Sequence, residues 1–473
     1  MKKRNVLILI VLCLSISACS DEEETDNPVP DAGESGDVWS NDHSDASPNE
    51  HSDPESSVDF ASIATGASHT CAIASDGGLW CWGSTRAHGL IYEVVQHPHP
   101  ALVDIPRRVG DDLWQSVTAG VYHTCAIRED HTLWCWGRNA NGQLGTHDDS
   151  SGLTEPEQVG DGLWREVIAE AIHTCGIQMD GTLWCWGDYD QGQPELDDET
   201  PRHWFPERVR GHLNWRTLST SRLHSCGIRK DGTLWCWGRA IDGQLGQEEY
   251  SFEQNQSPQR VGRESDWKFV DVGRAHTCGI REDQTLWCWG ANEEGQLGVG
   301  RGMYFGDEGP ERVGEDSDWT SVTAGREHTC GIRNDGTLWC LGNSRMGQLG
   351  NGDDTRNRYY PKQIGTRSDW AQVVAAGRHA CGIRDDQSLW CWGRNDVGQL
   401  GVGESSQLHS TPTRVGEASH WTSVSTNASL SATAFHTHAL DENGQGWSFG
   451  SNDDGQLGDG TLWEKTPTAV VVP

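Results

Sequence analysis

Cysteine and histidine are the residues of this chain whose types and spacing could do chemistry. The chain has 473 residues and 16 cysteines, and all of these except Cys13 and Cys19 form pairs ten residues apart. A histidine stands two residues before the first cysteine of each pair. Such groups can form disulfides, or each pair with its histidine can ligate a metal ion. The pairs are Cys71 with Cys81, Cys125 with Cys135, Cys175 with Cys185, Cys226 with Cys236, Cys278 with Cys288, Cys330 with Cys340, and Cys381 with Cys391; the histidines are His69, His123, His173, His224, His276, His328 and His379.

Each cysteine pair predicts a β-hairpin with an odd number of loop residues. If Cys125 and Cys135 oppose each other in antiparallel strands, the turn is centred on Asp130. Three-residue loops often end on a residue in the left-handed region, where glycine costs least. Gly336 has this position in its unit, whereas His131 shows that glycine is not required. Directly opposed Cα atoms lie at a distance that a disulfide can bridge.

The start of the chain predicts export. Lys2, Lys3 and Arg4 form a positive region before the apolar run of residues 6–16, which is typical of a cleaved signal peptide. Residues 16–19, Ile-Ser-Ala-Cys, resemble the lipobox of bacterial lipoproteins, which implies that residues 1–19 are a lipoprotein signal peptide and that Cys19 is lipidated. The serine after Cys19 then implies an anchor at the bacterial outer membrane, on its periplasmic or cell-surface side. An ordinary signal peptide with an incidental cysteine is the alternative.

In an exported chain, an even set of cysteines at fixed spacing indicates disulfides. Each would close a short loop and contribute about 2 to 3 kcal/mol in the chain-entropy model. The metal hypothesis is weaker because a strand places each histidine beside its own cysteine pair only, which supplies at most three ligands. We therefore expect seven disulfides, no metal site and no cofactor.

Composition excludes several classes of protein. The chain has 70 acidic and 36 basic side chains, a formal net charge of −34, and 35% hydrophobic residues. Nucleic acid is excluded as a partner because a phosphate backbone is bound by clustered Lys and Arg, whereas acidic side chains outnumber basic ones in this chain. No apolar run of 18 residues follows the first 20, which argues against a helical membrane bundle. Residues 20–57 hold 13 acidic and no basic side chains, so we expect a disordered acidic linker there.

From residue 58 to residue 473 the chain consists of eight similar units. The first cysteine recurs every 50 to 54 residues, and His438 takes its place in the eighth unit. A period of this length built from short β segments is typical of β-propellers. We expect repeats at residues 58–110, 111–160, 161–210, 211–262, 263–314, 315–365, 366–416 and 417–473.

The units resemble the regulator of chromosome condensation repeat. The resemblance rests on His328-Thr329, Asp335-Gly336, Trp339, Gly342-Asn343 and Gly347-Gln348-Leu349-Gly350, and on their equivalents in other units. It implies an all-β fold, a closed propeller of four-stranded blades. The family usually has seven blades, so seven or eight remain open here. We expect the repeated tryptophans to pack between blades and the repeated glutamine to bond to backbone.

Two groups of side chains are candidates for binding a partner. Aromatic residues gather in the variable stretch after each Gly-Gln-Leu-Gly, and would either ring one face of the propeller as a binding surface or pin long loops to the blades. Arginines precede the repeated histidine in four units and would lie on the opposite or the channel-side rim, either to hold an anionic partner or paired with local acids. The aromatic candidates are Trp204, Phe205, Tyr250, Phe252, Tyr304, Phe305, Tyr359 and Tyr360; the arginines are Arg222, Arg274, Arg326 and Arg378.

The expected function is that of a non-enzymatic, lipid-anchored binding or scaffold protein of the cell envelope whose propeller loops recognise a protein or a glycan. No catalytic motif is present, and no residue that breaks the repeat suggests a catalytic centre. The family resemblance implies two alternatives, a guanine-nucleotide exchange factor and an inhibitor of an extracytoplasmic enzyme. Export and disulfides argue against the former. An enzyme that uses the mouth of the channel is a further hypothesis.

Overall fold

The computed structural model describes residues 58–84, 102–146, 151–188, 202–209, 214–247, 255–302, 309–404, 406–426, 435–460 and 463–472. Within these ranges the chain is all-β and forms 30 strands. The described residues contain no helix long and apolar enough to cross a membrane. The signal peptide, Cys19 and the acidic linker lie outside the described residues.

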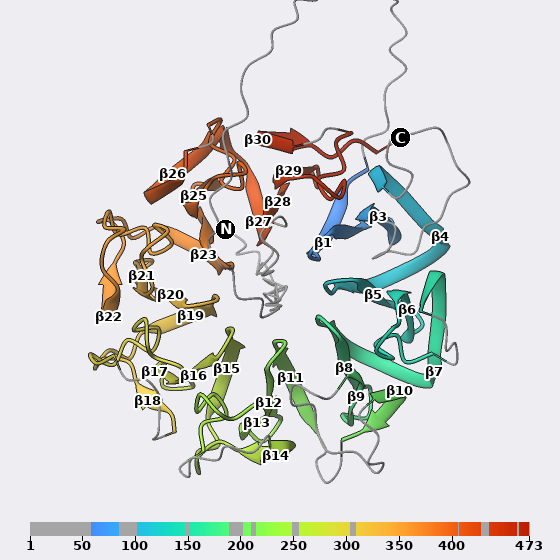
Figure 1. Cartoon of the computed structure of the whole chain (residues 1–473), viewed down its shortest axis with the longest axis horizontal. Helices are drawn as coiled ribbons and strands as arrows, with labels where there is room; N and C mark the ends of the chain where they lie inside the picture. The colour runs from blue at the N-terminus through green and yellow to red at the C-terminus, as the bar shows by residue number, and fades with distance from the viewer. Residues whose placement is uncertain are drawn as a thin grey trace, which may run out of the picture.

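The strands form eight four-stranded blades arranged in a ring (Figure 1). Blade 1 has β1 (Phe60–Thr65), β2 (His69–Ala74), β3 (Gly78–Ser84) and the first part of β4 (Leu102–Ala119). Blade 2 has the rest of β4, β5 (His123–Arg128), β6 (Thr132–Arg138) and the first part of β7 (Gly152–Ala169). Blade 3 has the rest of β7, β8 (His173–Gln178), β9 (Leu183–Asp188) and β10 (Arg202–Arg208).

The other five blades are separate four-stranded sheets. Blade 4 has β11 (Trp215–Thr220), β12 (His224–Arg229), β13 (Leu234–Gly238) and β14 (Asn255–Arg260). Blade 5 has β15 (Trp267–Val272), β16 (His276–Arg281), β17 (Leu286–Gly290) and β18 (Glu311–Arg312). Blade 6 has β19 (Trp319–Ala324), β20 (His328–Arg333), β21 (Leu338–Gly342) and β22 (Arg358–Gln363). Blade 7 has β23 (Trp370–Ala375), β24 (His379–Arg384), β25 (Ser388–Arg394) and β26 (Leu408–Ser419), and blade 8 has β27 (Trp421–Thr426), β28 (His436–Asp441), β29 (Gly446–Ser451) and β30 (Trp463–Ala469).

The first strand of each blade is innermost and the fourth is outermost (Figure 1). Two strands serve two blades each, because β4 pairs with β3 through its first part and with β5 through its second, and β7 does the same with β6 and β8. Blades 1 to 3 therefore share one ten-stranded sheet. The described residues form eight blades, one for each unit of the sequence. The propeller therefore has eight blades and not seven.

The central hairpin of each blade is held by its own side chains. In blade 6, Cys330 and Cys340 are directly opposed and joined by a disulfide, as are the six equivalent pairs, with Cα atoms 4.1 to 4.2 Å apart. At the turn, Thr337 donates to Oδ1 of Asp335 from its backbone N (2.9 Å) and from Oγ1 (2.6 Å). These hydrogen bonds hold the pKa of Asp335 below its usual value. The Asp-Gly-Thr sequence thus fixes the turn chemically as well as sterically.

Gly336 ends this turn in the left-handed region, with φ +76°, and a Cβ there would lie 2.5 Å from the carbonyl oxygen of Ser368. We expect Gly336→Ala to destabilise the protein by about 2 kcal/mol or more, because the backbone strain adds to this clash. Gly416→Ala is the matched control, since Gly416 has φ +60° and nothing within 4 Å of the added Cβ. Urea unfolding midpoints of the two variants measure the difference, and equal midpoints would contradict the contribution of the clash.

Neighbouring blades are joined by a repeated set of buried contacts. Between blades 4 and 5, the Cys226–Cys236 disulfide packs against Trp267 and Trp289, whose rings meet edge to face at 5.7 Å. Nε1 of Trp289 donates to the carbonyl of Gln244 in the preceding blade at 3.0 Å. The half-buried Trp287 packs on the same cluster. Both tryptophans of the repeated Trp-Cys-Trp segment therefore face the neighbouring blade, as the sequence predicts.

The repeated histidine, threonine and glutamine form a hydrogen-bonded link across the same interface. Thr277 donates to the carbonyl of Gln244 at 3.0 Å, and Nε2 of His224 lies 2.7 Å from the same Thr277 hydroxyl. Oε1 of Gln244 accepts from the backbone N of Asp242 at 2.9 Å. Burial lowers the pKa of His224 to about 3, so this histidine is neutral. The glutamine bonds to backbone, as predicted, and the histidine serves as a structural donor.

The ring closes between blade 8 and blade 1 without a shared strand. Trp82 and Thr70 of blade 1 donate to the carbonyl of Gln456 in blade 8 at 2.8 and 3.1 Å. The backbone N of Phe60 donates to the carbonyl of Gly444 at 2.6 Å. The same three contacts link blades 4 and 5, so closure follows from the repeat itself.

Candidate binding sites on the two faces of the propeller

The propeller has two chemically different faces. The loops between the first and second strands and those between the third and fourth strands emerge together, since the backbone N of Asn343 donates to the carbonyl of Glu327 at 2.9 Å and that of Arg239 to Leu223 at 2.9 Å. We call this the loop face. The hairpin turns and the starts of the innermost strands lie at the other end of the blades, which we call the turn face.

The four candidate arginines lie on the loop face, in the loops before β12, β16, β20 and β24. The alternative that placed them on the opposite face from the variable stretches is wrong, because both kinds of loop leave the blade at the same end. Glu327 forms ion pairs with Arg274 at 3.7 Å and with Arg326 at 3.4 Å. Arg378 directly precedes its histidine, whereas the other three stand two residues before theirs. Local pairing, rather than a free cationic arc, describes Arg274 and Arg326.

The candidate aromatics that the structure describes lie on outermost strands, not in free loops. Trp204 and Phe205 belong to β10, and Tyr359 and Tyr360 belong to β22, all at the loop-face end of the outer wall. The expectation that they sit in loops is wrong because the outermost strand begins earlier than its polar sequence suggests. Tyr250, Phe252, Tyr304 and Phe305 lie outside the described residues.

Tyr359 and Tyr360 pack against the loop that follows β17 in blade 5. The backbone N of Gly300 donates to the carbonyl of Tyr359 at 2.7 Å, and a Cβ on Gly302 would lie 2.6 Å from Cε1 of Tyr359. Tyr359 is thus an anchor for a neighbouring loop. Tyr360 is 67% exposed and Phe205 is 46% exposed, so these two keep the surface that a binding partner could use.

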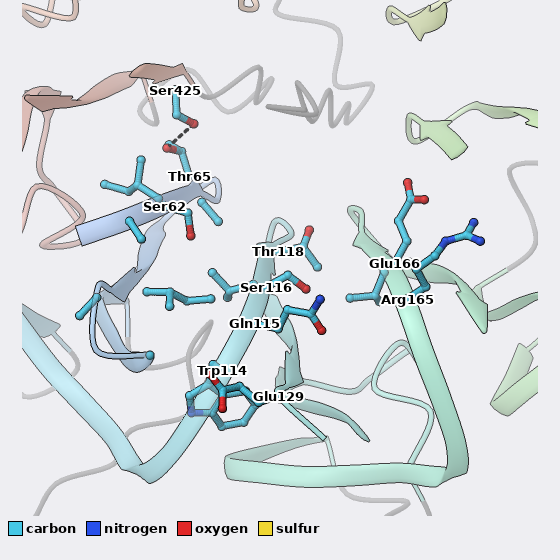
Figure 2. Close-up of a pocket in the computed structure, with 18 of the residues that line it drawn as sticks. Ser62, Thr65, Trp114, Gln115, Ser116, Thr118, Glu129, Arg165, Glu166 and Ser425 are labelled. Carbon is cyan, nitrogen blue, oxygen red and sulfur yellow. Dashed lines mark hydrogen bonds between the residues drawn. The ribbon is translucent and has the colours of Figure 1, made fainter. Parts of the chain in front are cut away.

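A cavity of about 870 Å³ opens at the turn face, at the mouth of the central channel. Figure 2 shows side chains that line it. Its wall is made by the innermost strands β1, β4, β7, β11, β15 and β27, with the turn between β2 and β3 at one side. Apolar groups such as Ile63, Val117 and Phe269 alternate there with hydroxyls, including Thr65, which donates to Ser425 at 2.9 Å. The cavity is therefore of mixed polarity and of the size of small-molecule sites.

Cations line one side of this cavity, one from each of three consecutive blades. Arg165, Arg216 and Lys268 each follow the tryptophan that opens an innermost strand. Nη2 of Arg165 donates to the carbonyls of Trp215 and Arg216 at 2.8 and 3.0 Å. Nη2 of Arg216 donates in turn to the carbonyls of Trp267 and Lys268 at 2.8 and 2.7 Å. Sequence reasoning missed this set, although the residue after the opening tryptophan differs from unit to unit and could have been compared.

Two carboxylates near the channel also escaped the sequence analysis. Glu166 lines the cavity beside Arg165 (Figure 2). Its Oε1 accepts from Oγ1 of Thr217 and from the backbone N of Leu218, both at 3.4 Å. Burial raises the pKa of Glu166 to about 7.

The second carboxylate, Glu170, stands where other units have Gly120, Gly273 or Gly325, and is fully buried. Neither of its carboxylate oxygens makes a hydrogen bond of ordinary geometry within the described residues. Burial outweighs the nearby backbone N–H of Ala171 and raises the pKa of Glu170 well above its usual value. Glu170 is therefore a buried acid whose neutral form is favoured by its surroundings.

Most of the groups considered as metal ligands have other partners among the described residues, the exceptions being the imidazoles of His173, through Nε2, and His328. The cysteines form the disulfides, and histidines such as His123 bond to the next blade, here to Oγ1 of Thr174 at 2.8 Å. Over the described ranges, no three His, Cys, Asp or Glu side chains are grouped as a metal ion would need. The arrangement serves packing.

Together, the closed ring, the bonded histidines and the surfaces of the two faces define a repeat-built β-propeller that presents binding surfaces. The chain belongs to the RCC1-like family: the RCC1-like domain model matches residues 29–313, and the regulator of chromosome condensation (RCC1) repeat models match residues 319–348 and 370–399, and 335–383 and 386–433.

Characterised relatives cover most of the chain. It is 28% identical over 412 residues to the ultraviolet-B receptor UVR8 of Arabidopsis thaliana, a match that spans 84% of this chain and 78% of that protein. It is 24% identical to the guanine nucleotide exchange factor SRM1 of Saccharomyces cerevisiae, over 75% of this chain and 73% of that protein. The fold and the family therefore indicate a propeller that acts as a regulator or a binder.

Solved structures share the fold. Prp20p from Saccharomyces cerevisiae, whose structure was reported with its binding to Gsp1p and histones, has a TM-score of 0.58 at 20% identity and covers 78% of this chain and 90% of its own. Human WBSCR16 has a TM-score of 0.56 at 18% identity and covers 84% of this chain and 95% of its own. Similarity at these identities supports the fold alone.

Proposed function

We propose that this protein is a non-enzymatic binding lipoprotein of the bacterial cell envelope that recognises a protein or a glycan through the loop face of its propeller. The observation that carries the proposal is the exposure of Phe205 and Tyr360 at the loop-face end of the outer wall. Large aromatics that stay exposed beside a rigid scaffold are the usual anchors of a binding surface. The blades hold them on strands, which keeps the ordering cost of binding low.

The same reasoning disfavours catalysis on this face. The cysteines are paired in disulfides and are unavailable as nucleophiles. The repeated histidines are buried between blades, and burial lowers the pKa of His276 to about 3, which is unsuited to a general base near neutral pH.

Placement outside the cytosol rests on the first 19 residues and on the disulfides. The signal-like segment and the lipobox-like residues before Cys19 support a lipid anchor at the outer membrane, and seven disulfides are typical of an oxidising compartment.

Two other functions stay as alternatives. The similarity to SRM1 favours guanine-nucleotide exchange, which the export signal and the disulfides argue against. Inhibition of an extracytoplasmic enzyme is one form that binding by the loop face could take.

The proposal is tested by affinity capture from cell envelopes with the full exported chain as bait. The double variant Phe205→Ala, Tyr360→Ala is expected to lose the partner, because it removes the exposed aromatic surface. The control is Leu113→Ala, Leu163→Ala, which removes exposed leucines (44% and 50%) from the turn face. In the same cells, Cys19→Ala should release the protein from the membrane fraction. Equal recovery of the same partners by both double variants would rule out the loop-face aromatics as the site.

A further inference from the structure

The mouth of the channel at the turn face carries a second inference, independent of the loop face. The innermost strands of the blades all enter the ring from the turn face. The residue after the aromatic that opens each innermost strand, Phe60 in blade 1 and a tryptophan in the others, therefore occupies the same level in every blade. In blades 3, 4 and 5 this residue is Arg165, Arg216 and Lys268, and all three line the cavity of about 870 Å³.

Backbone carbonyls hold the two arginines of this row in place. Nη2 of each arginine donates to two backbone carbonyls of the next blade. The second of these carbonyls belongs to the next cation of the row. Nε and Nη1 of both arginines have no partner among the described residues, and Lys268 has none there either. The two guanidinium groups are thus fixed in position with donors still free, which lowers the entropy cost of binding a ligand.

Charge in the cavity points to the class of ligand. None of the three cations forms an ion pair with a carboxylate of the described residues, although the chain as a whole has a net charge of −34. The acidic groups Asp76 and Glu129 line the side made by blades 1 and 2, whereas Glu166 lies beside Arg165. A row of three cations without ion pairs, two of them anchored, is a local site of positive potential within a strongly acidic protein.

We infer that Arg165, Arg216 and Lys268 form a binding site for a small organic oxyanion, a carboxylate, sulfate or phosphate group carried on a compact body. Guanidinium groups match such oxygens with charge-assisted hydrogen bonds. Phe269, Ile63 and Val117 offer apolar contact to the rest of the ligand. The nearest carboxylate, Glu166, opposes the bound anion and restricts the strength of binding when it is ionised.

The test is calorimetric titration of the full chain with glucuronate and glucose 6-phosphate at pH 8, with glucose as the uncharged probe. At least one anionic sugar is expected to bind at least tenfold more tightly than glucose. Lys268→Gln and Arg165→Gln are expected to weaken that binding at least tenfold, because each removes a charged donor. Glu166→Gln is expected to strengthen it severalfold. The side chain of Lys268 is exposed and makes no hydrogen bond or ion pair with a described residue, and its backbone carbonyl, which accepts from Arg216, is kept in the variant.

Arg345→Gln on the opposite face is the matched control for the loss of one positive charge, since Arg345 is 68% exposed there. It is expected to leave the affinity unchanged. The inference is overturned if neither anionic sugar binds better than glucose, or if Lys268→Gln binds as the unsubstituted protein does. These outcomes are separate from the capture experiment, because the variants here leave the loop-face aromatics intact.

Discussion

Replacing the fourteen paired cysteines with alanine is expected to abolish the cooperative unfolding transition of the propeller. Each disulfide closes a loop between residues ten apart and contributes about 2 to 3 kcal/mol in the chain-entropy model. Seven such contributions together exceed the roughly 5 to 15 kcal/mol by which a typical domain is stable. All fourteen cysteines are also fully buried, so their loss removes packing between blades.

Near-ultraviolet circular dichroism and urea unfolding measure this effect. The variant Cys330→Ala, Cys340→Ala is the graded control and should lose about 2 to 3 kcal/mol only. Blade 8 shows that a single blade folds without the bond, because His438 and Ser448 oppose each other there and Ser448 Oγ donates to the carbonyl of Leu457 at 2.7 Å. A fourteen-alanine variant that unfolds at the same urea concentration as the unsubstituted protein would show that the disulfides add no stability.

Glu170→Gln is expected to raise the stability of the protein at pH 6.5, relative to its effect at pH 4.5. Glu170 is fully buried without an ordinary hydrogen bond to its carboxylate oxygens among the described residues, and its pKa is raised well above 4.5. Between the unfolded and folded pKa, the folded state keeps a proton that the unfolded state has released. Stability is therefore lost as pH rises, by about 1.4 kcal/mol per unit. Glutamine cannot ionise, so the variant lacks this loss.

The measurement is the free energy of unfolding in urea at pH 4.5, 5.5 and 6.5. The exposed Glu155→Gln on β7 is the control for the removal of one acidic group. Glu170→Gly restores the residue that other units have and should behave like Glu170→Gln in its pH dependence. If unsubstituted protein and Glu170→Gln show the same slope of stability against pH, then Glu170 does not carry the buried proton.

Local features of the fold were predictable from the sequence. The separation of Cys125 and Cys135 predicts their pairing and a turn at Asp130. Which residues oppose each other in a hairpin depends only on the position and length of its loop, and both are local features of the sequence. The repeat of similar units predicts blades for the same reason, since each unit carries its own alternation and its own turn residues. The tryptophans and glutamines that join blades were recognised because they recur.

Features that depend on how blades meet were not predictable. Tyr359 and Tyr360 lie on β22 and not in a loop, because strand pairing with β21 extends through a polar segment that has no alternation of its own. Glu170 replaces a glycine of other units, which the sequence shows. Its raised pKa depends on full burial, and only the packing of the blades produces that burial. The long strands β4 and β7 likewise merge three units into one sheet.

The amino-acid sequence by itself determined the hairpins, their disulfide partners and the number of repeating units, because these follow from short-range spacing along the chain. Only the tertiary structure decided that these units make eight blades in a closed ring, and that Arg165, Arg216 and Lys268, about fifty residues apart, stand side by side at the mouth of a channel. Closing the ring brings together residues at one level of successive blades, and no local pattern encodes that level.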